Sequence, residues 1–272
     1  MMRLSVSNLA WPSDSDDQAF ALLATLGVRG VEVAPTRLAN WEDITTAQLA
    51  AYRRRVEDAG LVVSSLQALL FGTSGLALLG DRPSFDAMLE HMRRVTDIAA
   101  ALGAVAMVFG SPRNRLRGDM PPADAWELGR GRWREMGAIA ASGGTAIVIE
   151  PVPPYYGGDF LTQWGDVLAM VREVDHPGIR VHLDTGCVDL GGDLIQEAIA
   201  ASAPWLGHFH AAQPDLASFA EPAANHADAG SALHAVQYKG WVAIEMREQS
   251  PDPLGAMATA IRAVQAMYRM GQ

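Results

Sequence analysis

The chain has 272 residues and a formal net charge of −10, from 21 basic and 31 acidic side chains. An acidic surface is repelled by phosphate backbones, so nucleic acid is not expected as a partner. The sequence has no apolar run of about 18 residues, which excludes a membrane span, and its one cysteine excludes an internal disulfide framework. Because no signal peptide is visible, we expect a cytoplasmic protein.

Short apolar runs alternate with amphipathic segments along the whole chain. The runs are rich in Val, Ile and Leu and are bounded by glycine or polar residues, which is typical of buried parallel strands. We expect eight strands, at Leu4–Leu9, Gly30–Val33, Val62–Gln67, Ala106–Phe109, Ala146–Glu150, Arg180–Asp184, Gly207–His210 and Val242–Glu245.

The segments between these runs show the 3.6-residue period of helices that pack on a sheet. Phe85, Met88, Met92 and Val95 form one such apolar stripe. Glycine stands between a helical segment and the next strand at five places, where helices are expected to end: Gly27, Gly60, Gly103, Gly143 and Gly240. The repeated junction predicts a single-domain (β/α)8 TIM barrel over residues 1–272, since such barrels usually have about 250 residues.

A doubly wound open sheet is the alternative fold. It would need a glycine-rich phosphate turn directly after the first strand. The chain has Asn8–Pro12 at that point, with no glycine among these residues. The sequence therefore favours the barrel.

Four of the expected strands end in side chains that bind hard metal ions: Glu150, Asp184, His210 and Glu245. In a barrel, the carboxyl ends of the strands converge on the face that carries the active site. Each residue alone could be a solvated or hydrogen-bonded structural group, but four together favour a common site. Three carboxylates and one imidazole suit Mn²⁺, Mg²⁺, Co²⁺ or Zn²⁺, so we expect one divalent metal ion.

Two of these strands carry a histidine two residues before the expected ligand. Because side chains alternate along a strand, His182 faces the same way as Asp184, and His208 the same way as His210. We assign the outer residue of each pair to the metal and the inner one to a supporting layer. His182 is also a candidate for substrate binding.

The strand ends resemble those of the xylose isomerase-like barrel superfamily, in particular its branch of sugar phosphate isomerases/epimerases similar to tagatose 3-epimerase. The resemblance spans essentially the whole chain and rests on Ile149–Pro151, His182–Gly186, Gly207–His210 and Tyr238–Arg247. It implies that Glu150, Asp184, His210 and Glu245 bind one divalent metal. It also implies that Glu150 and Glu245 act as acid and base, and that copies of the chain can form a homo-oligomer.

The chain departs from the family at three positions near the expected site. Relatives that act on free ketohexoses carry a histidine where this chain has Cys187, and an arginine and a glutamate where it has Pro154 and Tyr156. The DNA-repair branch binds three zinc ions through extra histidines at the third and fourth strands. Here those strands end in Gln67 and Phe109. The substrate therefore stays open.

The expected chemistry is proton transfer next to a carbonyl. A metal that chelates a ketose polarises its carbonyl, and two carboxylates on opposite faces can remove and return a proton through a metal-held enediolate. This predicts an isomerase or epimerase of a sugar, sugar phosphate or polyol-derived ketone. The alternatives are a metal-dependent lyase or hydrolase, including an endonuclease IV-like phosphodiesterase, and a non-catalytic ligand-binding barrel.

Further side chains are candidates for binding a carbohydrate substrate: Glu32, Gln67, Arg113, Arg115, Tyr156, Cys187, His182 and Arg247. Arg113 and Arg115 could hold a phosphate or carboxylate group, or could instead form surface ion pairs. Glu32 could contact a hydroxyl or be a buried structural carboxylate. Cys187 is either a reactive thiol beside the metal or a small buried apolar group.

Overall fold

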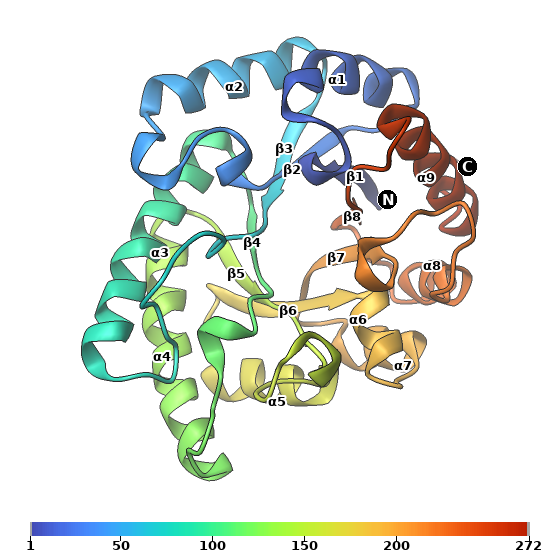
Figure 1. Cartoon of the computed structure of the whole chain (residues 1–272). Coiled ribbons are helices and arrows are strands. Elements are labelled where there is room, and N and C mark those ends of the chain that lie inside the picture. The colour runs from blue at the N-terminus through green and yellow to red at the C-terminus, as the bar shows by residue number, and fades with distance from the viewer. Residues whose placement is uncertain (1, 271–272) are drawn as a thin grey trace.

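Eight parallel strands close into a barrel in the computed structural model, which describes residues 2–270 (Figure 1). Each strand pairs with its neighbours in the sequence, and the last pairs with the first. The strands are β1 (Arg3–Ser7), β2 (Gly30–Val33), β3 (Val62–Leu66), β4 (Ala106–Phe109), β5 (Ala146–Ile149), β6 (Ile179–Asp184), β7 (Leu206–Ala212) and β8 (Trp241–Glu245). The predicted TIM barrel and its eight strands are confirmed.

Strand ends differ from the predicted ones by at most two residues. The first strand stops at Ser7 because the chain then enters a short 3-10 turn, Asn8–Ala10, in which the Ser7 hydroxyl accepts the Leu9 N–H at 3.2 Å. The seventh strand continues to Ala212, where it still pairs with β8.

Helices surround the barrel as an outer ring (Figure 1). They are α1 (Asp16–Thr25), α2 (Thr46–Asp58), α3 (Arg82–Leu102), α4 (Pro122–Ser142), α5 (Trp164–Val174), α6 (Thr185–Leu190), α7 (Ile195–Ser202), α8 (His226–Ala235) and α9 (Pro253–Met267). The short α6 follows β6 directly and lies at the carboxyl end of the barrel. Among residues 2–270, none of the helices has the length and hydropathy to cross a membrane.

Local sequence explains where α3 begins and ends. The Asp81 carboxylate accepts the Ser84 N–H at 2.9 Å, which satisfies one of the free donors of the first turn. The helix stops at Gly103, whose φ of 81° is a left-handed conformation that costs little without a side chain. Between these ends, the predicted stripe of Phe85, Met88 and Met92 is buried.

The barrel interior is divided between an apolar side and a polar side. Ala106, Val108 and Val148 form a small apolar cluster that is separate from the main core between strands and helices. Buried polar side chains of β2, β3, β6 and β7 occupy other interior positions: Glu32, Ser65, His182 and His208. The polar side lies beneath the predicted ligands and supplies hydrogen-bonding groups to them.

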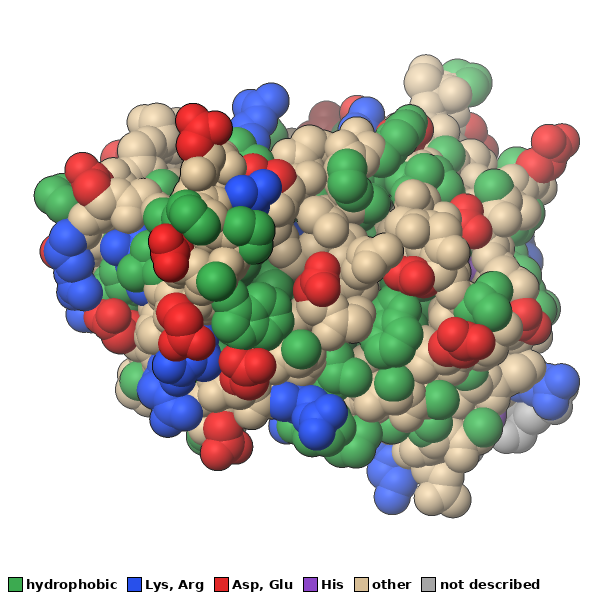
Figure 2. Space-filling model, turned by 90° about the horizontal axis from the view of Figure 1, so that it is seen from below, with side chains coloured by type: hydrophobic (Ala, Val, Ile, Leu, Met, Phe, Trp, Pro, Cys, Tyr) green, Lys and Arg blue, Asp and Glu red, His purple; other side chains and the backbone are tan. Residues whose placement is uncertain are grey.

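Ion pairs contribute little to the stability of this barrel. Figure 2 shows acidic and basic side chains interspersed with apolar groups on the face seen from below in Figure 1. Pairs such as Arg82–Asp86 at 2.8 Å and Arg130–Glu127 at 2.7 Å join exposed side chains, and exposed pairs are screened by water and salt. Stability therefore depends mainly on the buried contacts between helices and strands.

Replacing Met92 by alanine tests this dependence. Met92 is fully buried on α3, so we expect Met92→Ala to lower the free energy of unfolding by about 2–5 kcal/mol. Urea unfolding followed by circular dichroism measures the change. Asp97→Ala, at an exposed position of the same helix, is the control and should change it by less than about 0.5 kcal/mol.

Candidate active site

Four predicted side chains meet at the carboxyl end of the barrel. Glu150 follows β5, Asp184 ends β6, His210 lies in β7 opposite Asp184, and Glu245 ends β8. Single ligand atoms of Glu150, His182, Asp184 and His210 all lie within 4.8 Å of one another. Glu245 joins them through its Oε2, which is 3.1 Å from His210 Nδ1. We call Glu150, Asp184, His210 and Glu245 the metal cluster.

The Asp184 carboxylate has one oxygen fixed by the fold and one left for a ligand. Its Oδ1 accepts the Cys187 N–H at 2.7 Å and so caps α6. Its Oδ2 is buried without a hydrogen-bond partner and lies 3.6 Å from His210 Nδ1. A buried carboxylate oxygen without a partner is costly, and a cation at this point would remove that cost.

The position of the Glu150 carboxylate depends on Gly110, the first residue after the neighbouring strand β4. A Cβ atom at Gly110 would lie 1.7 Å from Glu150 Oε2, so no other residue fits there without moving the carboxylate. The backbone of Glu150 is held from two sides. Its N–H donates to the Phe109 carbonyl at 3.2 Å, and its carbonyl accepts from Arg115 Nη2 at 2.6 Å.

Crowding of buried carboxylates changes their protonation. Burial raises the pKa of Glu150 to about 8, and the charges of Asp184 and Glu245 act in the same direction. Burial also raises the pKa of Glu245, although His210 opposes the shift. Burial alone would lower the pKa of His210, but Glu32 and Glu245 together with Asp184 hold it well above its usual value. A divalent cation would take the place of these protons.

A carboxylate beneath the cluster orients His210. Glu32 Oε1 lies 2.9 Å from His210 Nε2, and Glu32 Oε2 lies 2.9 Å from His208 Nε2 and accepts the Ser65 hydroxyl at 2.7 Å. These contacts use Nε2 of His210 and leave Nδ1 directed at Asp184 and Glu245. Burial by itself would raise the pKa of Glu32, but the two histidines hold it well below its usual value. In metal sites, a carboxylate bonded to one ring nitrogen fixes the orientation of a histidine that binds the metal through the other nitrogen.

His182 fills the layer below the cluster. Its side chain is fully buried, both ring nitrogens lack hydrogen-bond partners, and its ring packs edge-on against His210 at 4.2 Å. Burial lowers its pKa well below the usual value, so the ring is neutral. The inner position predicted for His182 agrees with this placement.

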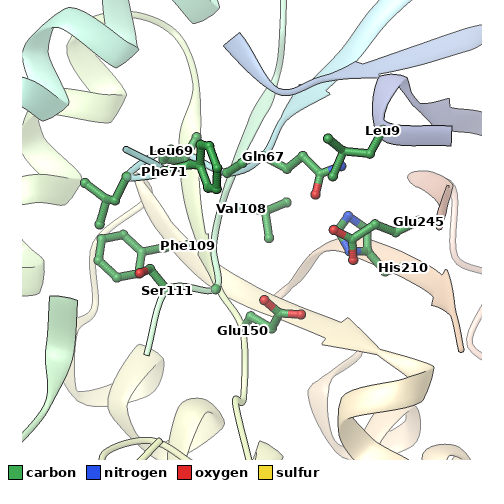
Figure 3. A pocket seen from close by; sticks show the side chains of 13 residues that line it. Leu9, Gln67, Leu69, Phe71, Val108, Phe109, Ser111, Glu150, His210 and Glu245 are labelled. Atoms are coloured by element: carbon green, nitrogen blue, oxygen red, sulfur yellow. The ribbon is translucent and has the colours of Figure 1, made fainter. Parts of the chain in front are cut away.

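Two adjoining cavities open above the cluster, with volumes of about 250 and 240 Å³. Both are lined by Gly110, Glu150 and Glu245. The first extends over the ends of β3 and β4, as Figure 3 shows, and includes His210 and Gln67. The second lies over the ends of β5 to β8 and includes Asp184, Tyr156, Cys187 and Arg247. We call them the first and the second lobe.

The two predicted loop arginines lie elsewhere. Arg115 is only 1% exposed, and burial lowers its pKa to about 10. Its Nη2 is bonded to the Glu150 carbonyl, and it is not among the residues that line either lobe. Arg113 is exposed on the same turn and also lies outside both linings. Arg115 therefore stabilises the backbone at the end of β5, where Glu150 lies.

Cys187 faces the carboxylates as a thiol. Burial raises its pKa well above the usual value, and Asp184 and Glu150 add to the shift. Its Sγ donates to Glu150 Oε1 at 3.6 Å. Without a metal ion, these surroundings favour the thiol over the thiolate.

Two polar side chains of the second lobe, Gln213 and Asp215, were not predicted from the sequence. The Gln213 side chain is fixed, because its Oε1 accepts the Ala224 N–H at 3.1 Å and its Nε2 lies 2.6 Å from His226 Nε2. Asp215 has a φ of 58° and donates its N–H to the Tyr156 hydroxyl at 2.7 Å. A proline in the sequence after the seventh strand indicates a loop there, but it does not show which side chains of the loop point into the cavity.

The sequence matches a known protein family over most of its length. Residues 20–267 match the family described as xylose isomerase-like TIM barrel. The chain belongs to this family. Among curated proteins, none matches the sequence significantly.

Solved structures share the fold at low sequence identity. L-ribulose 3-epimerase superposes with a TM-score of 0.82 at 17% identity, covering 99% of this chain and 96% of the other. The 3-keto-D-glucoside 4-epimerase of E. coli gives 0.79 at 17% identity, covering 98% and 100%. D-psicose 3-epimerase of Clostridium cellulolyticum, solved with D-tagatose, gives 0.78 at 16% identity, covering 98% and 97%. At such identities the likeness establishes that this xylose isomerase-like chain shares their barrel fold.

Removing the charge of Glu32 should weaken metal binding. Because Glu32 orients His210 from below, we expect Glu32→Gln to raise the Kd for Mn²⁺ about 10- to 100-fold. Isothermal titration calorimetry measures the Kd. Glu42→Gln, at an exposed position of another loop, should leave it unchanged. An unaltered Kd for Glu32→Gln, in a folded protein, would show that the carboxylate plays no part in ligand orientation.

Metal binding should release protons. Glu150, with a pKa of about 8, binds a proton at pH 7 in protein without metal, and the raised pKa of His210 favours its protonated form as well. A bound cation must displace such protons. Affinity for Mn²⁺ should therefore rise as the pH increases from about 6 to 8. Calorimetry at pH 7 in two buffers of different ionisation enthalpy measures the protons released. A heat of binding that is the same in both buffers would contradict the expectation.

Proposed function

We propose that this barrel is a divalent-metal-dependent isomerase or epimerase of a sugar, sugar phosphate or polyol-derived ketone. The observation that carries the proposal is the meeting of Glu150, Asp184, His210 and Glu245 where the two lobes adjoin, with Glu150 and Glu245 lining both. Solved neighbours named as L-ribulose, D-psicose and 3-keto-D-glucoside epimerases support the same class.

The residues fit one divalent cation. Three carboxylates and one imidazole are a donor set for Mn²⁺, Mg²⁺, Co²⁺ or Zn²⁺, and the unpartnered Oδ2 of Asp184 supports a ligand role. Glu150, Asp184, His210 and Glu245 would hold the ion. When bound, it would polarise a substrate carbonyl and so make the adjacent C–H more acidic.

Glu150 and Glu245 can act as the acid and base. They come from strands three apart in the ring, and Figure 3 shows their carboxylates approaching the cavity from different sides. One carboxylate would remove the proton next to the carbonyl, and the other would deliver a proton to the opposite face of the enediolate. This sequence inverts the carbon, whereas delivery to the neighbouring carbon exchanges aldose and ketose.

The second lobe would bind the polyol part of the substrate. Tyr156, Gln213, Asp215 and Arg247 line it and offer hydroxyl, amide, carboxylate and guanidinium groups. Arg247 is the predicted arginine that lines the lobe. A phosphate or carboxylate on the substrate would therefore meet Arg247.

Proton exchange tests the proposed chemistry. We expect the manganese-loaded protein to incorporate deuterium from heavy water into one member of a panel of ketoses, sugar phosphates and inosose-type ketones, at the carbon next to the carbonyl. Glu150→Gln and Glu245→Gln should each slow incorporation by about 10²- to 10⁴-fold, since each removes an acid/base group. Mass spectrometry measures the rate.

Metal content and a control variant keep this test specific. Glu57→Gln changes an exposed glutamate on α2 and should exchange at the original rate. Elemental analysis separates a loss of metal from a loss of proton transfer. Full turnover by either cluster variant would refute the assignment, and loss of water or cleavage without exchange would indicate a lyase or hydrolase.

A further inference from the structure

The imidazole of His182, beneath the metal cluster, is buried without hydrogen bonds. Its side chain is fully buried, and neither ring nitrogen has a hydrogen-bond partner within residues 2–270. His208 occupies the paired position of β7, but its Nε2 lies 2.9 Å from Glu32 Oε2. Burying a polar ring without partners costs free energy. A contact that compensates this cost is therefore expected at His182 and not at His208.

A ring nitrogen of His182 lies close to three residues of the metal cluster. One ligand atom of His182 is within 4.8 Å of one ligand atom each of Glu150, Asp184 and His210. Bonds from Zn²⁺ to nitrogen or oxygen, of about 2.0–2.2 Å, place opposed ligand atoms about 4.2 Å apart, so the group would contract by about half an ångström around an ion. Asp184 Oδ2 also lacks a hydrogen-bond partner in the described part of the chain. Two unpartnered residues in one close group favour a cation between them.

His182 approaches the cluster from inside the barrel. It precedes Asp184 by two residues on β6, and its ring packs edge-on against the ring of His210, with centroids 4.2 Å apart. Unlike Glu150 and Glu245, it is not among the residues that line either lobe. A ligand in this position would leave the side of the ion that faces the lobes open for a substrate, as catalytic metal sites require. The same placement does not support direct contact between His182 and a substrate.

We propose that His182 is a further ligand of the metal ion, bound through one ring nitrogen from inside the barrel. The inference rests on the proposed function for the presence of the ion, and it adds a nitrogen to the four predicted ligands. Two imidazoles and three carboxylates would then surround the ion. Because a second imidazole favours borderline-soft ions over hard ones, the site would prefer Zn²⁺ or Co²⁺ to Mg²⁺.

Proton NMR of the Co²⁺-loaded protein counts the histidines that bind the ion. A paramagnetic ion shifts the ring N–H protons of its imidazole ligands far outside the usual range, and exchange for deuterium distinguishes them from carbon-bound protons. We expect two such resonances, one from His210, whose Nε2 is held by Glu32, and one from His182. His182→Phe keeps a ring of similar size without nitrogen and should remove one of them. A single shifted N–H resonance in the unchanged protein would contradict the proposal.

Metal affinity provides an independent measurement. Calorimetry with a competing chelator should show that His182→Phe raises the Kd for Co²⁺ about 100-fold and the Kd for Mg²⁺ less than about three-fold, because Mg²⁺ gains little from a nitrogen ligand. His234→Phe makes the same change at an exposed position of α8 and should leave both values unchanged. In urea unfolding of metal-free protein, His182→Phe should have an unchanged or higher midpoint, since it removes two unpartnered nitrogens.

The outcomes separate a ligand from a structural histidine. Equal effects of His182→Phe on the two ions, or a lower urea midpoint with unchanged affinities, would give His182 a structural role and overturn the proposal. Failure of the unchanged protein to bind any divalent ion would refute the proposed function together with this ligand. Binding of an ion with only His210 shifted would refute the His182 ligand alone.

Discussion

The constraint on which the site depends is the enforced proximity of buried carboxylates. Closure of the barrel places Glu150, Asp184 and Glu245 around one imidazole. Burial, reinforced by the charges of Asp184 and Glu245, raises the pKa of Glu150 to about 8. Such an arrangement persists because the surrounding fold fixes each side chain and because protons or a cation can neutralise it. A small, highly charged ion bound at this point would relieve the crowding.

The fold maintains this crowding through supports on three sides. Below the cluster, Glu32 binds His210 and turns its free nitrogen toward the carboxylates. Beside it, Gly110 leaves room for the Glu150 carboxylate, while buried Arg115 holds the Glu150 carbonyl. The helix that follows Asp184 fixes one of its oxygens. Each of these groups fixes the position of a cluster residue. Rigid support of this kind gives a binding site its precise geometry.

The same pair of carboxylates lines two adjoining lobes, and this arrangement bears on substrate selection. The side chains around both lobes would position a substrate against Glu150 and Glu245. That position decides which carbon lies between the two carboxylates.

The sequence by itself determined the barrel, its strands to within two residues, and the four strand-end side chains that meet, because hydrophobic period and glycine position are local properties. It did not separate Arg115, which is buried under Glu150, from Arg247, which lines the second lobe, since both simply follow strands. The space at Gly110, the bond from Glu32 to His210 and the inward turn of Gln213 were decided only by tertiary structure. The physical reason is that the first two features join strands far apart in the chain, at distances that closure of the barrel sets. The third depends on how the loop after β7 folds back, so that Ala224 and His226 bond the Gln213 side chain.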